Sequence, residues 1–379
     1  MPCLYASIVI NFAISSKILL WLFFERHFVI RPFLAYLTCM KCFRLTLLSI
    51  CLLFPLAHAA DLAGTTPFQF KYIKELSDLP SATDEHLSKA HGGFAVDSRT
   101  GEVFFGLKGA GVIWMSNDLK QKKVLPITDP EIIEGNFHNT TILYRADGER
   151  FIALPDNEKA RVYIISDEGK LVSTLNSPTR MNDYYGKGGD FKPTDTEYAG
   201  GKLYVADGYS RGNYISIADP WSATWSDHHF GGKATDLDEY GLFGTAHGIT
   251  LDPLQRRLAV ADRANSRIED FDFQGTFLEN TNLPAGSLPC DIDFHDGYAL
   301  VGCLRGPSGQ TPAPCFVLDK DGKVISQVTP KKDFGLELFN HIHNAAWKPL
   351  LAEDGSVEKL YILATAWNPG GFAVMEVVK

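Results

Sequence analysis

The sequence predicts an all-β chain that folds as a six-bladed β-propeller, and three observations lead to this prediction. From residue 60 onwards the chain shows short apolar, strand-like runs and almost no long helical periodicity. Turn sequences containing Asp and Gly follow several of these runs, as hairpins require. The strand element at residues 203–207 recurs at residues 258–262 with the same Leu-x-Val-Ala-Asp pattern. A recurring unit of roughly 40–50 residues built from short strands is typical of propellers.

Six expected first strands divide the chain into six units. Each follows a small or polar residue, and these residues are His91, His138, Asp195, His247, Cys290 and His343. They are separated by 47, 57, 52, 43 and 53 residues, which is enough for four strands per unit. The apolar segment at residues 68–72 is expected to complete the last blade and close the ring. The alternative, two unrelated β-sandwiches, does not explain the recurring strand element.

The first 59 residues differ in kind from the rest of the chain. Residues 40–59 combine a short basic start, an apolar core and small residues at positions 57 and 59, which predicts a signal peptide cleaved after Ala59. Residues 1–39 form an apolar extension. It is either a membrane helix or sequence upstream of the true start, and we favour a start at Met40. The expected mature domain is a propeller over residues 60–379 of an exported protein, periplasmic or secreted.

The charge of the chain limits its partners. The formal net charge is −9, and removal of residues 1–59 takes away five basic side chains and one acidic side chain, which leaves −13. An acidic surface of this kind argues against nucleic acid and anionic membranes as partners. A small-molecule or peptide-like substrate is expected instead. The acidic balance is also compatible with binding of divalent cations.

Three cysteines remain in the mature region. Cys290, Cys303 and Cys315 are spaced 13 and 12 residues apart around two expected turns. Cys303 is therefore a candidate cross-strand neighbour of either of the other two. An exported chain can hold one disulfide here, with one thiol left over. The sequence does not decide which pair forms.

Three histidines indicate a metal site. His138, His247 and His343 each open an apolar segment and lie 109 and 96 residues apart, about two repeats each. Residues just before the innermost strands line one mouth of a propeller's channel, and blades 2, 4 and 6 are about 120° apart in a sixfold ring. Three converging imidazoles favour zinc, with copper, nickel and iron as alternatives, and leave a fourth position open. His91 occupies the same position in blade 1.

Two of the units carry a family resemblance. Residues 205–210 and 260–268 resemble NHL-type propeller repeats. More narrowly, Pro193-Thr194-Asp195 before Val205-Ala206-Asp207-Gly208-Tyr209, together with the His247 blade that ends at Ala261 to Ile268, resembles peptidyl-α-hydroxyglycine α-amidating lyase. The resemblance spans roughly residues 88–377 and is specific in blades 3 and 4. It implies a six-bladed propeller with zinc held by one histidine from each of three blades.

The resemblance also implies roles for site residues. His138, His247 and His343 would bind zinc, Tyr209 would take the proton of the substrate hydroxyl, and Arg263 would lie near the substrate carboxylate. The implied reaction splits a carbinolamide into an amide and glyoxylate. These residue types suit that chemistry, because zinc and a tyrosinate can deprotonate a hydroxyl and a guanidinium binds a carboxylate bidentately.

The chain departs from the family at several positions. A second family arginine corresponds at best to Lys108, which lacks the guanidinium fork. His341 stands where the family has an apolar residue and is an alternative ligand to His343. With His91 and Lys108, it is expected to border the substrate. The calcium-binding aspartate of the family is Asn344 here, which puts the calcium in question.

Two other functions remain open at this point. The first is an NHL-type propeller without catalysis that binds a protein or ligand across its face. The second is a calcium-dependent, lactonase-like hydrolase. That class needs a channel rich in Glu, Asn and Asp, whereas this register is expected to supply mainly His.

Overall fold

The computed structural model describes residues 62–178, 185 and 190–378. The chain divides into two units, Met1–His58 and Ala59–Lys379. The predicted apolar extension at residues 1–39 and the predicted signal peptide at residues 40–59 lie outside the described residues. Within the part that the structure describes, no helix has the length and apolar character needed to cross a membrane.

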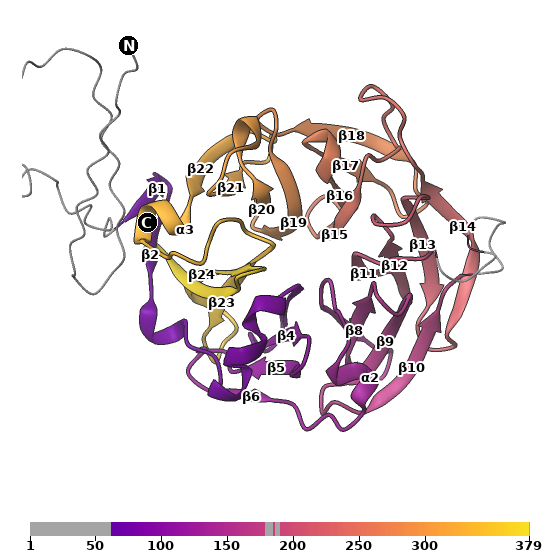
Figure 1. Cartoon of the computed structure of the whole chain (residues 1–379), viewed down its shortest axis with the longest axis horizontal. Helices are drawn as coiled ribbons and strands as arrows, with labels where there is room; N and C mark the ends of the chain where they lie inside the picture. The colour runs from indigo at the N-terminus through magenta and orange to yellow at the C-terminus, as the bar shows by residue number, and fades with distance from the viewer. Residues whose placement is uncertain (1–61, 179–184, 186–189, 379) are drawn as a thin grey trace, which may run out of the picture. The chain divides into compact units, whose positions relative to one another are not determined.

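Six antiparallel sheets form a ring, which confirms the predicted all-β, six-bladed propeller (Figure 1). Blades 1 and 2 consist of β3 (Gly92–Val96), β4 (Val103–Leu107), β5 (Gly111–Met115) and β6 (Lys122–Val124), then β7 (Thr141–Tyr144), β8 (Arg150–Asp156), β9 (Arg161–Ser166) and β10 (Leu171–Asn176). Blades 3 and 4 consist of β11 (Asp195–Ala199), β12 (Lys202–Ala206), β13 (Tyr214–Asp219) and β14 (Thr224–Gly231), then β15 (Ala246–Asp252), β16 (Arg257–Asp262), β17 (Arg267–Phe271) and β18 (Phe277–Asn282). Blade 5 consists of β19 (Leu288–His295), β20 (Tyr298–Arg305), β21 (Cys315–Leu318) and β22 (Val324–Val328).

The sixth blade closes the ring with strands from both ends of the described chain. It contains β23 (Asn344–Leu351), β24 (Val357–Ala366), β25 (Gly371–Val378), β2 (Phe68–Tyr72) and β1 (Ala63–Thr65). β2 pairs with β25 in antiparallel register, with Phe70 opposite Val377. The expectation that residues 68–72 complete the last blade is confirmed.

Helical segments are short and lie between strands. They are η2 (Lys74–Leu76), η3 (Ser81–Lys89), α2 (Pro130–Ile133), η4 (Arg263–Asn265), η5 (Pro307–Gly309) and α3 (Pro330–Phe334). η4 matters for function because it begins with Arg263, directly after β16, and so positions this side chain near the start of blade 4.

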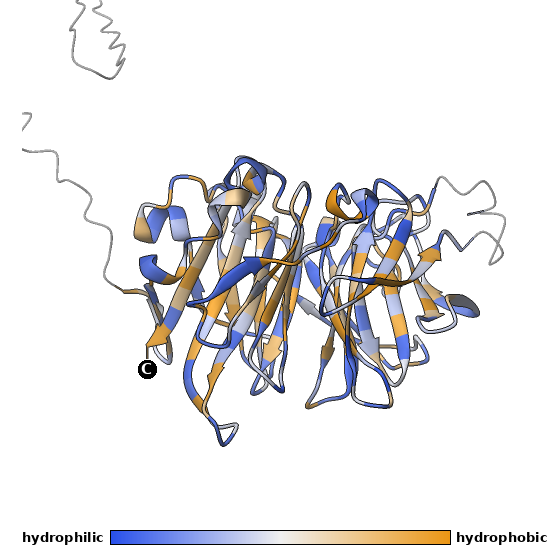
Figure 2. Cartoon of the chain, turned by 90° about the horizontal axis from the view of Figure 1, so that it is seen from below, coloured by the Kyte–Doolittle hydropathy of each residue, from blue (hydrophilic) through white to orange (hydrophobic). Residues whose placement is uncertain are grey.

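Apolar side chains fill the spaces between neighbouring blades. Phe104, Phe137 and Tyr163 pack between blades 1 and 2, and Phe70 and Trp347 pack with blade 5 side chains at the closing blade. Apolar positions concentrate in the strands, and polar positions concentrate in the connecting loops at both ends (Figure 2). Each blade therefore buries both of its faces, and the ring leaves only a narrow space at its axis.

Polar side chains bridge the blades along the axis. Asp195 Oδ2 in blade 3 accepts from the amide of Ile249 in blade 4 at 2.7 Å, and Asp291 Oδ2 in blade 5 accepts from the amide of Ala345 in blade 6 at 3.1 Å. With Asn139, these carboxylates line a cavity of about 360 Å³ inside the ring. We expected the first strands to bring mainly histidine to the channel. This is wrong for the positions that follow the histidines, where Asn and Asp side chains line the cavity.

The three cysteines are free and buried. Cys303 packs between blades 4 and 5, and Cys315 packs between blades 5 and 6. These two thiols therefore lie on opposite faces of blade 5 and cannot bridge, although their strands pair. The expected disulfide is not formed in this structure.

Replacement of a closing side chain is expected to destabilise the ring. Phe70 is fully buried in the core of the closing blade. Phe70→Ala should lower the free energy of unfolding by about 3–5 kcal/mol through lost burial and the cavity left behind. Lys71→Ala, at an exposed position on the same strand, should change it by less than about 0.5 kcal/mol. Urea unfolding measures both, and equal effects would contradict a closing role for β2.

The channel carboxylates should make stability depend on pH. Burial raises the pKa of Glu197 to about 7, although the amides of Leu251 and Tyr198 donate to its carboxylate. The folded chain therefore keeps a proton between about pH 4.5 and 7 that the unfolded chain has lost, and wild-type stability falls as pH rises through this window. The free energy of unfolding of Glu197→Gln, compared with that of wild type at the same pH, should rise by about 1–3 kcal/mol from pH 5 to pH 8. If the difference in unfolding free energy between the variant and wild type is the same at pH 5 and pH 8, the prediction is wrong.

Candidate functional site

The predicted histidines occupy one equivalent position at the start of the first strands. Asn139, Asp195 and Asp291 each accept the backbone amide of the following residue, so His138, Thr194 and Cys290 are structurally equivalent. The first strands of blades 1, 4 and 5 carry register shifts at this position, around Gly93, Gly248 and Cys290. Such bulges turn a side chain out of the ordinary strand alternation. The register shifts therefore direct the side chains at these positions toward the axis of the ring.

Each ring of the histidine triad, His138, His247 and His343, is held by its Nδ1 atom. His138 Nδ1 lies 3.0 Å from the carbonyl oxygen of Thr194, and His247 Nδ1 lies 2.7 Å from that of Cys290. His343 Nδ1 lies 2.9 Å from Asn344 Oδ1. Because these oxygens only accept, each Nδ1 carries the hydrogen and each Nε2 keeps its lone pair. This arrangement is the one that orients metal-binding histidines in proteins.

The triad converges at the axis of the ring. The ring centroid of His138 lies 4.7 Å from that of His247 and 4.8 Å from that of His343. The ring centroids of His247 and His343 lie 5.2 Å apart. Two sets of three residues each have their ligand atoms within 4.8 Å of one another. The first set is His91, His138 and His343, and the second is His247, Cys290 and His343. The structure thus brings the three predicted rings close together, although neither set of ligand atoms contains all three, and it adds His91 and Cys290 as neighbours.

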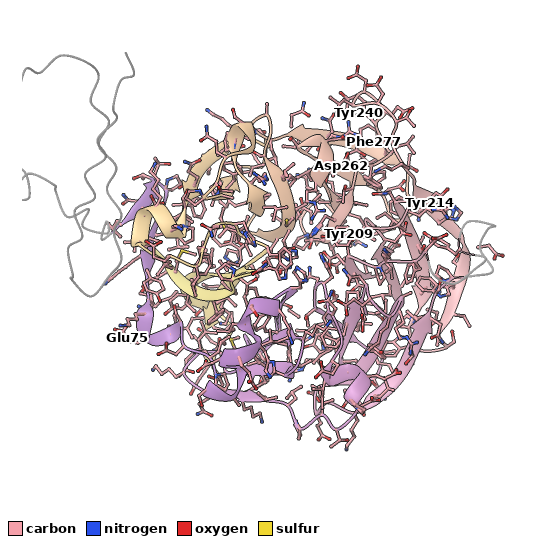
Figure 3. The ribbon with its side chains drawn as sticks, viewed as in Figure 1. Glu75, Tyr209, Tyr214, Tyr240, Asp262 and Phe277 are labelled. Carbon is pink, nitrogen blue, oxygen red and sulfur yellow. The ribbon has the colours of Figure 1, made fainter. Side chains whose placement is uncertain are left out.

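Tyr209 lies near the centre of the ring (Figure 3), and Arg263 reaches its hydroxyl group. The hydroxyl of Tyr209 lies 3.1 Å from His138 Nε2 and 3.1 Å from His247 Nε2. Arg263 Nη1 donates to this hydroxyl oxygen at 3.0 Å. The phenol therefore has its proton next to an imidazole lone pair and its oxygen next to a positive charge, as a group that cycles between phenol and phenolate requires.

Burial keeps the triad neutral. It lowers the pKa of His138, His247 and His343 well below the usual value, and the charges of neighbouring imidazoles and of Arg263 lower it further. Burial raises the pKa of Tyr209, and the Arg263 guanidinium acts in the opposite direction. Neutral imidazoles are the form that binds metal.

The expected substrate-contacting histidines lie beside the triad. His91 packs 4.5 Å from the His343 ring and stacks on Trp367 at 4.5 Å. His341 lies 6.2 Å from Trp367, and His343 rather than His341 belongs to the converging groups. Lys108 forms an ion pair with Glu158, which itself acts electrostatically on His91. Lys108 is thus near the mouth, but its ammonium group is already paired.

Two site residues were not predicted from the sequence. The sequence suggested Cys290 as a blade marker and as a disulfide candidate but not as a site residue, although it stands where other blades carry histidine, and this equivalence was the available signal. Trp367 follows β24 and reaches His91 from a loop, and no pattern in the sequence indicates this contact. Both narrow the space around the triad.

The chain is similar to peptide-amidating enzymes. It is 28% identical over 195 residues to peptidyl-glycine alpha-amidating monooxygenase A of Xenopus laevis, which covers 44% of this chain and 20% of the relative. It is 25% identical over 159 residues to peptidyl-alpha-hydroxyglycine alpha-amidating lyase 1 of Drosophila melanogaster, covering 40% and 25%. The matched regions span a quarter or less of these two relatives, and no protein-family model matches. The predicted resemblance to the amidating lyase is confirmed at this distance.

Solved structures support the fold. A gluconolactonase from Xanthomonas campestris matches with a TM-score of 0.55 and 13% identity, over 85% of this chain and 97% of the other. A luciferin-regenerating enzyme matches with a TM-score of 0.52 and 11% identity, over 82% and 95%. At these identities the likeness concerns the propeller alone.

The anchoring of one ring can be tested without knowledge of the substrate. Asn344→Ala removes the acceptor of His343 Nδ1 and should weaken binding of an added divalent metal about 10–100-fold, as losses of such outer partners do. Asn139→Ala is the matched control, because Asn139 follows His138 in blade 2 without accepting from its ring. Competition with a chromophoric chelator measures both. Equal affinities for the two variants would contradict the anchoring role.

Proposed function

We propose that this protein is an exported, zinc-dependent carbon–nitrogen lyase that splits an α-hydroxy amide into an amide and glyoxylate. The proposal extends the distant similarity to amidating enzymes to a site with the residues this chemistry needs. The single observation that carries it is the placement of the Tyr209 hydroxyl between the Nε2 atoms of His138 and His247 with Arg263 as its third partner.

The donor set fits zinc. Three neutral imidazoles lie with ring centroids 4.7, 4.8 and 5.2 Å apart, and each is oriented by an acceptor at Nδ1. The histidine triad would hold the ion. Bound there, zinc would lower the pKa of a hydroxyl group placed against it.

Tyr209 is the proposed base and then the acid. In the phenolate form, its oxygen takes the proton of the substrate hydroxyl while the carbon–oxygen double bond forms. The carbon–nitrogen bond breaks, its electron pair moves to nitrogen, and Tyr209 returns the proton to that nitrogen. Atoms and charge balance, and the products are an amide and glyoxylate. Arg263 stabilises the phenolate through its 3.0 Å hydrogen bond.

Arg263 is also the proposed partner of the substrate carboxylate. Its guanidinium lies over the Tyr209 ring, 5.0 Å from the centroid, and most of its surface is buried. The guanidinium donates one hydrogen bond to Tyr209 through Nη1, and its other N–H groups can donate to a carboxylate. Since Lys108 is paired with Glu158, a single strong carboxylate contact is expected, which favours a small substrate over a long peptide.

A lactonase-like hydrolase is the second candidate. The cavity below the triad contains Asn139, Asp195 and Asp291, the oxygen-rich set that such an enzyme needs for calcium. However, both oxygens of Asp195 and both of Asp291 already accept backbone amides, so these carboxylates link blades. The lyase is therefore preferred. A propeller that binds a partner without catalysis would show activity in neither assay below.

The first test is turnover of a model substrate. Zinc-loaded protein is expected to release glyoxylate from an acylated α-hydroxyglycine, measured with a coupled dehydrogenase, and to lose this activity on chelation. Calcium-dependent opening of a sugar lactone without glyoxylate release would favour the second candidate. Inactivity on a series of α-hydroxyglycine amides would overturn the lyase proposal and leave the fold untouched.

The second test concerns Tyr209. Tyr209→Phe should lower kcat by about 10²–10⁴-fold, because a general base contributes about that much, while zinc content is retained. Tyr298→Phe, a change on β20 at the edge of the closing core, is the matched control and should leave kcat unchanged. An active Tyr209→Phe enzyme would exclude the proposed proton transfer.

A further inference from the structure

A fourth imidazole lies in the same layer as the triad. The expectation that His91 shares the register position of the triad is wrong by one residue: Gly93 lies against Asn139 and Asn344, which follow His138 and His343, so Gly92 holds that position and His91 precedes it. Its ring centroid lies 4.5 Å from that of His343 and 5.0 Å from that of His138, the same spacing as within the triad. Its ligand nitrogen lies within 4.8 Å of ligand nitrogens of both rings. His91 therefore borders the triad on the side of His138 and His343.

His91 has a buried nitrogen without a partner among the described residues. Its Nδ1 atom accepts or donates no hydrogen bond there, whereas the Nδ1 atoms of the triad are all engaged. A buried polar atom left unsatisfied costs about 1–3 kcal/mol. Stacking on Trp367 holds the ring in place despite this cost. The His91 ring is hydrogen-bonded to Asn136, so the unpartnered Nδ1 is the nitrogen left available to a bound cation.

Cys290 is the competing fourth ligand. Its sulfur lies within 4.8 Å of ring nitrogens of His247 and His343. However, Arg263 donates to this thiol, and the Cys290 carbonyl already anchors His247. Its short side chain is thus committed to positioning the groups around it. His91 has no comparable commitment at Nδ1.

We propose that His91 is a fourth imidazole ligand of the metal ion, alongside the histidine triad. This inference rests on the metal of the proposed function and goes beyond it, because a three-histidine site would leave His91 to the substrate. With four imidazoles on the ion, a substrate hydroxyl would have to be accommodated as a fifth ligand. Zinc can expand to five ligands, and copper, nickel and iron also accept imidazole.

The test is X-ray absorption spectroscopy of the zinc-loaded, purified protein. Wild type is expected to show four imidazole scatterers at about 2.0–2.1 Å, and His91→Ala is expected to show three. The control His228→Ala removes an exposed histidine on β14 and should keep four. The affinity for zinc should fall at least about tenfold in His91→Ala and remain unchanged in the control.

Several outcomes would overturn the proposal. Three imidazoles in wild type would return His91 to the substrate, and a sulfur scatterer at about 2.3 Å would identify Cys290 as the ligand. In both cases the lyase proposal would stand. A wild-type protein that binds no metal would overturn both proposals. If His91→Ala does not fold by circular dichroism, the wild-type spectrum and the His91→Asn variant decide the question.

Discussion

The closure of six blades around one axis is the constraint on which the site depends. The first strands of all six blades face the same axis, so residues at equivalent positions come close together. The blades are then joined by hydrogen bonds that cross from one to the next. The carbonyl of Thr194 in blade 3 holds His138 of blade 2, and the carbonyl of Cys290 in blade 5 holds His247 of blade 4. The structure that closes the ring also sets the tautomers of the site.

The same crowding decides the electrostatics. Four imidazoles, a phenol and a guanidinium share a space that excludes most water, so protonation of any imidazole would add a charge beside Arg263. Burial and this repulsion together lower the histidine pKa values, with that of His91 lowered to about 4. The site therefore holds neutral lone pairs at physiological pH. A cation is the natural occupant of such a centre, because neutral imidazole is the form that binds metal.

Much of the fold and part of the site could be predicted from the sequence. Blade spacing and the recurring strand element are local patterns, so the six blades, the closing segment and the convergence of His138, His247 and His343 followed from them. The partners of those rings could not be predicted, because the acceptors come from other blades. Trp367 lies on His91 because of a loop conformation. Lys108 pairs with Glu158, which is 50 residues away in the chain.

The oxygen-rich layer beneath the triad shows why residue type alone misleads. Asp195 and Asp291 could serve a calcium ion, yet their oxygens receive backbone amides from neighbouring blades. Only the register between blades separates a structural carboxylate from a ligand. The thiols of blade 5 make the same point, because Cys303 and Cys315 sit on paired strands but face different cores.

The central claim is that the histidines of alternate blades hold a metal ion at the axis. Elemental analysis of the purified wild-type protein and of His247→Ala tests it most directly. We expect about one zinc ion per wild-type chain and a loss of most of it in the variant, with both proteins folded by circular dichroism. A folded wild type that takes up no metal from solution would contradict the account.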